Sequence, residues 1–400
     1  MKKFGFGSMR LPCNSDDPKD IDLPQIFEMV DRYIESGFNY FDTAYGYHDG
    51  LSEVALRKAV TERYPREDVI IADKLPVYML KPSHNLEEIF SEQKERCGVE
   101  YFDYYMLHNI TNNFYNGIIP QLKCFEFAEK LKEEGFIRHL GISFHDDAET
   151  LDKILSEHPS IEFVQLQINY LDWDNEGIQS GKCYEVARKY NKDIIVMEPL
   201  KGGILAGKMP DEVESIFKKA DPSKTNAEWS ISWILNHPEI TCVFSGMNNI
   251  AQIDENIAIG NSVEPHSMSL EELETIDYAK RALKELLQIN CTSCGYCLPC
   301  PRGVNISECM KIYNEKYLFN QKGLLNQSLI DYYLTVSGIM IDSSNAGLCN
   351  GCGKCLRKCP QHLDIPKELD KVKKEFEGHF FKFKVLFIKS IGMKIYQKFF

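Results

Sequence analysis

The stretch CTSCGYCLPCP at residues 291–301 and its counterpart CNGCGKCLRKCP at residues 349–360 decide how the C-terminal part of the chain folds. The second run has the spacing C-x2-C-x2-C-x3-C-P, and the first is one residue shorter before its last cysteine. Such spacing lets three thiolates turn onto one cubane 4Fe–4S cluster, while the fourth cysteine, followed by proline, reaches across to the other cluster. The sequence therefore predicts a ferredoxin-like domain with two 4Fe–4S clusters.

Two sets of four cysteines follow from this crossed arrangement. One set joins three cysteines of the first run to the last cysteine of the second: Cys291, Cys294, Cys297 and Cys359. The other set joins three cysteines of the second run to the last cysteine of the first: Cys349, Cys352, Cys355 and Cys300. Because Cys300 comes one residue early, the spacing specifies the clusters more strongly than it specifies the crossed pairing.

Two other roles for these cysteines fit the sequence less well. Structural zinc uses paired C-x2-C units, but it does not account for two four-cysteine runs that each end in Cys-Pro. Disulfides are disfavoured, because an acidic chain that begins without a signal sequence is expected in a reducing compartment. The remaining cysteines stand singly and are expected to be buried thiols: Cys13, Cys97, Cys124, Cys183, Cys242 and Cys309.

The composition fits a large globular domain followed by a small one. With 44% hydrophobic and 26% charged residues in 400, the chain can bury a sizeable core. Its formal net charge of −13 disfavours binding to the phosphate backbone of nucleic acid. No stretch has about eighteen uninterrupted apolar residues, and the N-terminus lacks the apolar core of a signal peptide, so we expect a cytoplasmic protein.

From residue 1 to about 262, short apolar segments alternate with longer amphipathic segments. Residues 24–37, for example, have apolar side chains at three- and four-residue spacing and end at a glycine, which is typical of a helix. Repeated strand–helix alternation predicts a parallel (β/α)8 TIM barrel. An open doubly wound sheet is the rival, but no G-x-G-x-x-G follows the first strand. The expected strands are residues 3–7, 38–42, 69–73, 103–107, 138–142, 163–167, 193–197 and 241–245.

These patterns predict three parts of the chain. Residues 1–289 form the barrel with a trailing helix, and residues 290–370 form the iron–sulfur domain, which is small and mainly helical. Residues 303–348, between the cysteine runs, form a helical insertion in that domain. Residues 371–400 form a basic, apolar C-terminal tail.

The end of this tail, residues 378–400, has five lysines, no acidic residue and many large apolar side chains. Its lysines do not share one face of a helix, so we expect it to pack on the protein or on a partner subunit. Peripheral contact with an anionic membrane surface is the alternative.

Polar side chains follow three successive strands of the predicted barrel. Functional side chains of such a barrel sit at the carboxyl ends of strands. There the sequence places Asp42, with Tyr47 in the loop beyond it, then Lys74, then His108. Each has a structural explanation by itself, as a helix cap, a solvated lysine or a core histidine. Together, at neighbouring strand ends, they predict one pocket.

Such a pocket suits the reduction of a carbonyl group. Hydride addition builds negative charge on the carbonyl oxygen, and a proton donor must neutralise it. A lysine ammonium lowers the pKa of a neighbouring tyrosine, and an aspartate keeps that lysine charged and oriented. A histidine can donate a hydrogen bond to the carbonyl oxygen and position it.

The same segments resemble the aldo-keto reductase family: FDTAYGY, ADKLP, YYMLHN and GISF (141–144). The resemblance extends from residue 1 to about 262. It implies a (β/α)8 barrel that binds an extended nicotinamide cofactor without a Rossmann fold. It also implies that Asp42, Tyr47, Lys74 and His108 form the catalytic tetrad, with Tyr47 as the general acid.

Carried over by position, the resemblance implies cofactor contacts on the later strands. Ser143 and Gln167 match residues that hold the nicotinamide carboxamide, and Ser245 matches a phosphate contact. Glu255 and Asn256 match groups near the adenine.

Three features depart from the family pattern. Gln252 stands where many relatives place an arginine against the 2′-phosphate of NADP, so the sequence predicts NAD(P)H without a preference for NADP. Met197 stands where relatives often stack an aromatic ring on the nicotinamide. The cysteine-rich tail is absent from ordinary single-domain members and resembles a ferredoxin-fused branch of the superfamily.

The two predicted cofactors differ in how they carry electrons. Nicotinamide delivers two electrons as hydride and each cluster passes one, so a flavin normally stands between them, yet the sequence has no flavin motif. The clusters then relay electrons to or from a partner protein, have a structural role, or sense oxidants; two clusters in one fold favour the relay.

We therefore expect an NAD(P)H-dependent oxidoreductase that interconverts a small carbonyl compound and an alcohol. One alternative is an iron–sulfur electron-transfer or scaffold protein whose barrel binds a nucleotide. The other is a barrel enzyme with a bound flavin and ferredoxin-linked chemistry.

Overall fold

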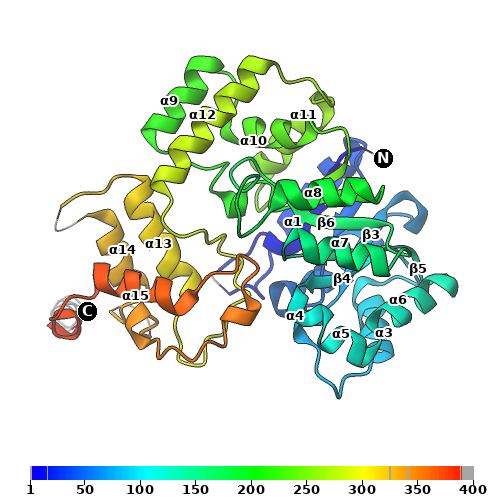
Figure 1. Cartoon of the computed structure of the whole chain (residues 1–400), viewed down its shortest axis with the longest axis horizontal. Helices are drawn as coiled ribbons and strands as arrows, with labels where there is room; N and C mark the ends of the chain where they lie inside the picture. Colours follow the sequence, from blue (N-terminus) through cyan, green and yellow to red (C-terminus); the bar gives the residue numbers. More distant parts are fainter. Residues whose placement is uncertain (1, 16, 324–325, 340–341, 388, 390–400) are drawn as a thin grey trace. The chain divides into compact units, whose positions relative to one another are not determined.

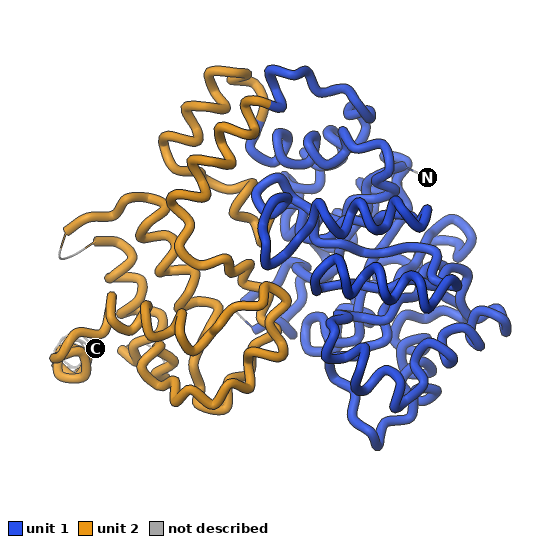
Figure 2. The backbone as a smooth tube through the Cα atoms, viewed as in Figure 1, with its two compact units in different colours: residues 1–200, 225–273 blue, residues 201–224, 274–400 orange. Residues whose placement is uncertain are grey.

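The computed structural model describes residues 2–15, 17–323, 326–339, 342–387 and 389. The chain divides into two compact units, which Figure 2 colours separately: residues 1–200 with 225–273, and residues 201–224 with 274–400. Residues 201–224, which the sequence placed in the barrel, group with the C-terminal unit. A side chain at Gly202 would meet the backbone oxygen of Thr292 at 2.2 Å, so this segment packs directly on the first cysteine run.

Eight parallel strands form a closed barrel in sequence order, with β1 paired to both β2 and β8 (Figure 1). This confirms the predicted (β/α)8 fold. The longest strand passes the predicted end at residue 107, because it continues beyond a register irregularity between Leu107 and Ile110. The strands are β1 Phe4–Gly7, β2 Tyr40–Asp42, β3 Ile70–Leu75, β4 Phe102–Ile110, β5 Ile137–Phe144, β6 Phe163–Gln167, β7 Asp193–Met197 and β8 Ile240–Gly246.

A hydrophobic layer fills the barrel interior next to the predicted site. Side chains two residues apart on a strand point to the same face. The layer includes Tyr40, two residues before Asp42, and Ala72, two residues before Lys74. The side chains of Asp42 and Lys74 therefore point into the barrel, one layer closer to the carboxyl ends of the strands. The layer consists of Tyr40, Ala72, Met106, Phe163, Ile195, Cys242 and Phe244.

Helices of the barrel unit alternate with the strands and pack against them (Figure 1). In α1 (Leu23–Glu35), the side chain of Asp22 caps the N-terminus by accepting from the Gln25 N–H, and Gly37 follows the C-terminus with a φ of 82°. The buried Tyr33 hydroxyl lies within hydrogen-bond distance of two backbone oxygens, those of Phe4 and Tyr40, both at 3.0 Å. These contacts join α1 to the first two strands.

Twelve α-helices precede the first cysteine run in the described chain. They are α1 Leu23–Glu35, α2 Ser52–Leu56, α3 Leu86–Cys97, α4 Asn112–Tyr115, α5 Ile118–Leu122, α6 Cys124–Glu133, α7 Ala148–Glu157, α8 Ser180–Lys189, α9 Asp211–Ala220, α10 Asn226–Leu235, α11 Ile250–Ser262 and α12 Leu270–Leu286.

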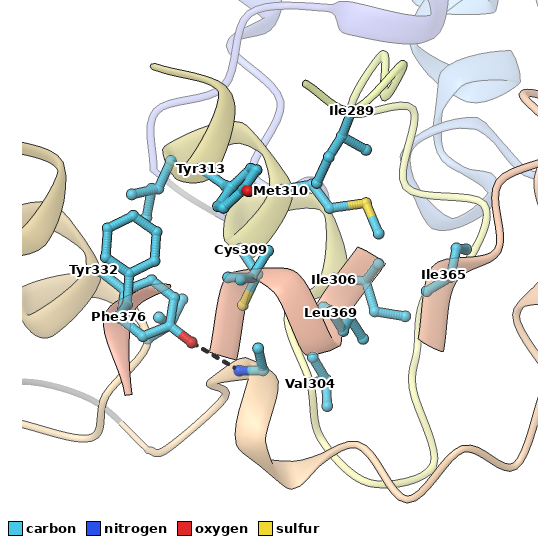
Figure 3. Close-up of a cluster of buried hydrophobic side chains, with 14 of the residues drawn as sticks. Ile289, Val304, Ile306, Cys309, Met310, Tyr313, Tyr332, Ile365, Leu369 and Phe376 are labelled. Carbon is cyan, nitrogen blue, oxygen red and sulfur yellow. Dashed lines mark hydrogen bonds between the residues drawn. The ribbon is translucent and has the colours of Figure 1, made fainter. Parts of the chain in front are cut away.

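The C-terminal unit has its own hydrophobic core, shown in Figure 3. The core forms between α13 (Ile306–Leu318), α14 (Gln327–Thr335) and α15 (Ile365–Phe376), of which α13 and α14 make up the predicted helical insertion. Tyr332 stacks on Phe376 at 4.6 Å between ring centroids. Its hydroxyl accepts from the Ala346 N–H at 2.9 Å, the bond drawn in Figure 3.

The chain entering the first cysteine run is tied to this core. The Asn314 amide donates to the backbone oxygen of Ile289 at 2.7 Å and accepts from the Ile289 N–H at 2.9 Å. Among the described residues, no helix is long and apolar enough to cross a membrane. Residues 388 and 390–400 of the predicted tail lie outside the described part of the chain.

Candidate functional site

A buried ion pair joins the ends of β2 and β3. The Lys74 ammonium donates to Asp42 Oδ2 and to the backbone oxygen of Thr43, each at 2.6 Å. The Lys74 side chain is 0% exposed and that of Asp42 is 6% exposed. Burial raises the pKa of the Asp42 carboxyl, and the Lys74 ammonium opposes that rise. These bonds hold the Lys74 ammonium at one position inside the barrel.

Tyr47 lies next to this charge. The Lys74 Nζ is 4.9 Å from the centroid of the Tyr47 ring. The loop that carries the ring is anchored by His48, whose Nε2 accepts from the Leu11 N–H at 3.0 Å and whose Nδ1 lies 2.7 Å from the backbone oxygen of Pro18. Both contacts fit one tautomer, with the proton on Nδ1. His48 has a φ of 51°, a conformation that histidine tolerates better than most residues.

His108 completes the group from β4. Its ring centroid is 5.9 Å from that of Tyr47, with the rings nearly perpendicular at 84°. Burial lowers the pKa of His108 well below its usual value, and the nearby Lys74 and His145 lower it further. His108 is therefore neutral near neutral pH. Asn109, with a φ of 59°, lies at the register irregularity between Leu107 and Ile110 of β4, a feature common beside active sites.

The structure thus brings all four predicted residues of the tetrad together.

Two further residues were missed by the sequence reasoning. The Gln165 amide donates to Asp42 Oδ1 at 3.4 Å, and its position two residues before Gln167 on β6 was the available signal. Tyr78 lies 5.2 Å from His108 between ring centroids. A Cβ at Gly46 would lie 2.4 Å from the Tyr78 hydroxyl, so a glycine at this position leaves room for the Tyr78 side chain.

A second buried group of acids lies on the opposite face of β3. Burial and the adjacent Glu53 raise the pKa of Asp73 well above its usual value. Glu53 accepts from Arg96 at 3.0 Å, and the Asp73 carboxylate accepts from the Lys74 N–H at 2.8 Å. Burial raises the pKa of Glu53 as well, and the Arg96 guanidinium opposes that rise. This group supports the strand that carries Lys74.

The predicted nicotinamide contacts lie at the ends of β5, β6 and β7. The Ser143 hydroxyl lies 3.4 Å from His145 Nε2 and 3.9 Å from the sulfur of Met197, so these side chains are neighbours. The buried Gln167 donates to Asp172 Oδ2 at 2.9 Å. Hydroxyl and amide groups of this kind can donate to and accept from a carboxamide.

The predicted phosphate and adenine contacts lie on β8 and α11. The Asn256 amide donates to the Ser245 hydroxyl at 3.1 Å, and both residues are buried. The Gln252 amide oxygen accepts from the Asn248 N–H at 2.9 Å, within the first turn of α11. Glu255 lies half-buried on the same helix. Uncharged side chains therefore dominate this end of the predicted cofactor site.

Four cysteines line one cavity in the C-terminal unit: Cys291, Cys294, Cys297 and Cys359. They are the first predicted ligand set, and Ile306, Met310 and Leu363 line the same cavity. The Ser293 N–H lies 3.4 Å from the Cys291 sulfur. Gly295 has a φ of 80°, which lets the run turn between Cys294 and Cys297. Four thiols around one cavity with apolar walls are the donor set that a 4Fe–4S cluster requires.

The second predicted set also lies together. Burial raises the pKa of the Cys355 thiol, and the neighbouring thiols of Cys349, Cys300 and Cys352 raise it further. Cys300 is therefore near the thiols of the second run. Among the single cysteines, Cys13 is half-buried rather than buried, with its sulfur 3.8 Å from His48 Nδ1, which corrects that expectation.

Two family models match the chain. The Aldo/keto reductase family model matches residues 3–278, and the 4Fe-4S dicluster domain model matches residues 290–364. An uncharacterized oxidoreductase of Schizosaccharomyces pombe is 26% identical over 269 residues, covering 64% of this chain and 81% of that protein.

Two more relatives are named by their cofactors. The NADH-specific methylglyoxal reductase of Escherichia coli is 23% identical over 301 residues, covering 65% of this chain and 90% of that protein. An aldo/keto reductase from Klebsiella pneumoniae, crystallised with NADP and acetate, superposes with a TM-score of 0.54 at 19% identity, covering 69% of this chain and 90% of that one. This last similarity supports the fold.

Proposed function

The chain belongs to the aldo/keto reductase family and carries a C-terminal 4Fe-4S dicluster domain, and from this premise we propose that it reduces a small carbonyl compound with a nicotinamide cofactor. The observation that carries the proposal is the grouping of a lysine, an aspartate, a tyrosine and a histidine at the carboxyl end of the barrel. A buried ammonium, held at 2.6 Å by Asp42, lies 4.9 Å from the Tyr47 ring. The His108 ring lies 5.9 Å from the same tyrosine.

Tyr47 acts as the general acid for reduction and the general base for the reverse reaction. A positive charge beside a phenol favours the phenolate, which makes the hydroxyl a better proton donor to a developing alkoxide. Asp42 keeps the Lys74 ammonium in place, and Gln165 donates to the same carboxylate. Because the charge is buried, solvent screens its effect on Tyr47 less than it would at the protein surface.

His108 positions the carbonyl oxygen. A neutral imidazole has one N–H, and the lowered pKa of His108 keeps the ring neutral around pH 7. It can therefore donate a hydrogen bond to the oxygen while Tyr47 delivers the proton. The oxygen would receive two donors, which is the arrangement that stabilises developing negative charge.

The nicotinamide cofactor supplies hydride to the carbonyl carbon when it is bound. Ser143, Gln167 and Met197 would hold its reactive ring, and Ser245 and Asn256 would hold its phosphate and adenine ends. Gln252 offers no cation to a 2′-phosphate, and relatives are named for NADH as well as for NADP. We therefore propose that the protein accepts NADH, with no requirement for the 2′-phosphate.

The C-terminal unit binds two 4Fe–4S clusters in this proposal. One is held by Cys291, Cys294, Cys297 and Cys359, which line one cavity. The other is held by Cys349, Cys352, Cys355 and Cys300. Two clusters in one small domain suit one-electron transfer to or from a partner protein.

Replacing Tyr47 with phenylalanine tests the carbonyl reductase proposal. The protein, purified without oxygen, is assayed with NADH and NADPH against a panel of aldehydes and ketones. Tyr47→Phe should lower the turnover number by about 10²-fold to 10⁴-fold and leave cofactor binding unchanged. Tyr45→Phe is the matched control, because the Tyr45 hydroxyl donates to Glu92 at 2.8 Å and takes no part in the site. Unchanged carbonyl reduction in Tyr47→Phe would refute the proposal.

A further inference from the structure

A short helix beyond α15 is anchored to the C-terminal unit by one of its sides. Residues 381–387 are helical, and Phe381 and Val385 pack against the hydrophobic core. The Phe381 ring centroid lies 5.3 Å from that of Tyr333 and 6.3 Å from that of Tyr332. The position of this helix on the unit is therefore fixed.

The other side of the helix presents large apolar side chains to solvent. The exposed fraction is 71% for Phe380, 68% for Phe383 and 68% for Leu386. The Phe387 ring stacks on that of Phe383, with 6.4 Å between centroids and 13° between planes. Three- and four-residue spacing places these side chains on one stripe. A contiguous exposed apolar stripe of this kind is typical of a surface that binds a membrane or another protein.

Positive charge borders this stripe. Lys382 and Lys384 are both exposed and flank Phe383 in the sequence, so at about 100° per residue they lie on either side of the stripe. Residues 378–400 contain five lysines and no acidic residue, although the chain has a net charge of −13. The charge of the segment is therefore opposite to that of the chain and complements an anionic surface.

We propose that residues 380–387 dock the protein on an anionic lipid bilayer. The apolar stripe lies at the boundary between headgroups and acyl chains, and the flanking lysines extend their ammonium groups to the lipid phosphates. A bilayer accounts for both the apolar stripe and the flanking lysines, because its acyl chains lie directly beneath a continuous layer of anionic headgroups. The helix lies in the interface, held at its opposite side by Phe381 and Val385.

Vesicle flotation with the full-length, cluster-loaded protein tests this proposal. Phosphatidylcholine vesicles with and without phosphatidylglycerol are compared at low and high salt. The wild-type protein should float with the anionic vesicles at low salt and remain unbound with neutral ones. Lys382→Gln with Lys384→Gln should lower the partition coefficient about thirtyfold, and Phe383→Ser with Leu386→Ser should lower it at least as much.

The matched control is Leu270→Ser, which removes another exposed leucine, 79% exposed at the start of α12, and should not change binding. Iron content equal to that of the wild type shows that each variant is folded. Failure of the wild-type protein to float with any vesicle would overturn the proposal, as would equal flotation with neutral vesicles. A dimer that Phe383→Ser dissociates, without vesicle binding, would identify a second copy as the occupant and also overturn it.

Discussion

Replacing Lys74 with methionine separates the structural role of the buried ion pair from the catalytic role that we propose for it. Methionine has a similar length and no charge, so the change removes the ammonium that Asp42 and Thr43 hold at 2.6 Å each. The Asp42 carboxylate would remain buried, with the Gln165 amide at 3.4 Å. Leaving one member of a buried pair uncompensated costs about 3–5 kcal/mol of stability.

A second substitution should restore this stability. In the double variant, Lys74→Met with Asp42→Asn, both charges are gone and the asparagine amide can still bond to its neighbours. Replacing both members of a buried pair is often close to neutral, so we expect most of the lost 3–5 kcal/mol to return. Catalysis should not return, because no ammonium lies beside Tyr47. Both variants should turn over about 10²-fold to 10⁴-fold more slowly than the wild type.

Denaturant unfolding and steady-state oxidation of the nicotinamide measure the two effects. The three tryptophans, Trp173, Trp229 and Trp233, all belong to the barrel unit, so their fluorescence reports its unfolding. Lys182→Met is the control, because that lysine is 57% exposed in an ion pair with Glu176 and should cost about 0.5 kcal/mol or less. Recovered turnover in the double variant, or a stability loss no larger than that of the control, would refute the reasoning.

Two further predictions follow from the pKa of His108 and from the cysteine cavity. Burial keeps His108 neutral in the fold while the unfolded chain binds a proton below about pH 6.5, so acid favours unfolding by up to about 1.4 kcal/mol per pH unit. His108→Asn should remove that slope from the stability curve measured between about pH 5 and 7, and an unchanged slope would count against the assignment. Cys359→Ala should lower the bound iron by about half, whereas Cys309→Ala, a buried cysteine outside both sets, should retain it. Iron and sulfide analysis after anaerobic purification decides between these results.

The strands and the tetrad were accessible to sequence reasoning because both depend on local patterns. Alternating apolar segments of five residues predicted strands such as β6 and β7 with the bounds that the structure has. Asp42, Lys74 and His108 could be placed together because the carboxyl ends of parallel strands meet at one end of a barrel. Cysteine spacing similarly encodes which thiols lie near one another.

Other features depend on contacts between distant residues and left no local signal. The raised pKa of Asp73 follows from its burial and from the approach of Glu53, which lies on another element and is paired with Arg96. Residues 201–224 belong to the C-terminal unit, where Gly202 lies against the backbone of residue 292, a contact that no periodicity reveals. The bond from Gln165 to Asp42 joins β6 to β2 across the barrel interior.

The central claim, that hydride passes from nicotinamide to a carbonyl carbon while Tyr47 supplies the proton, is tested most directly by isotope transfer. Nicotinamide cofactor deuterated at the transferred position is oxidised anaerobically by the cluster-loaded protein with a carbonyl substrate, and the alcohol is analysed by mass spectrometry. The proposed function predicts one deuterium on the carbinol carbon. An alcohol without deuterium, or oxidation of the cofactor with bleaching of the cluster absorption and no alcohol, would contradict it.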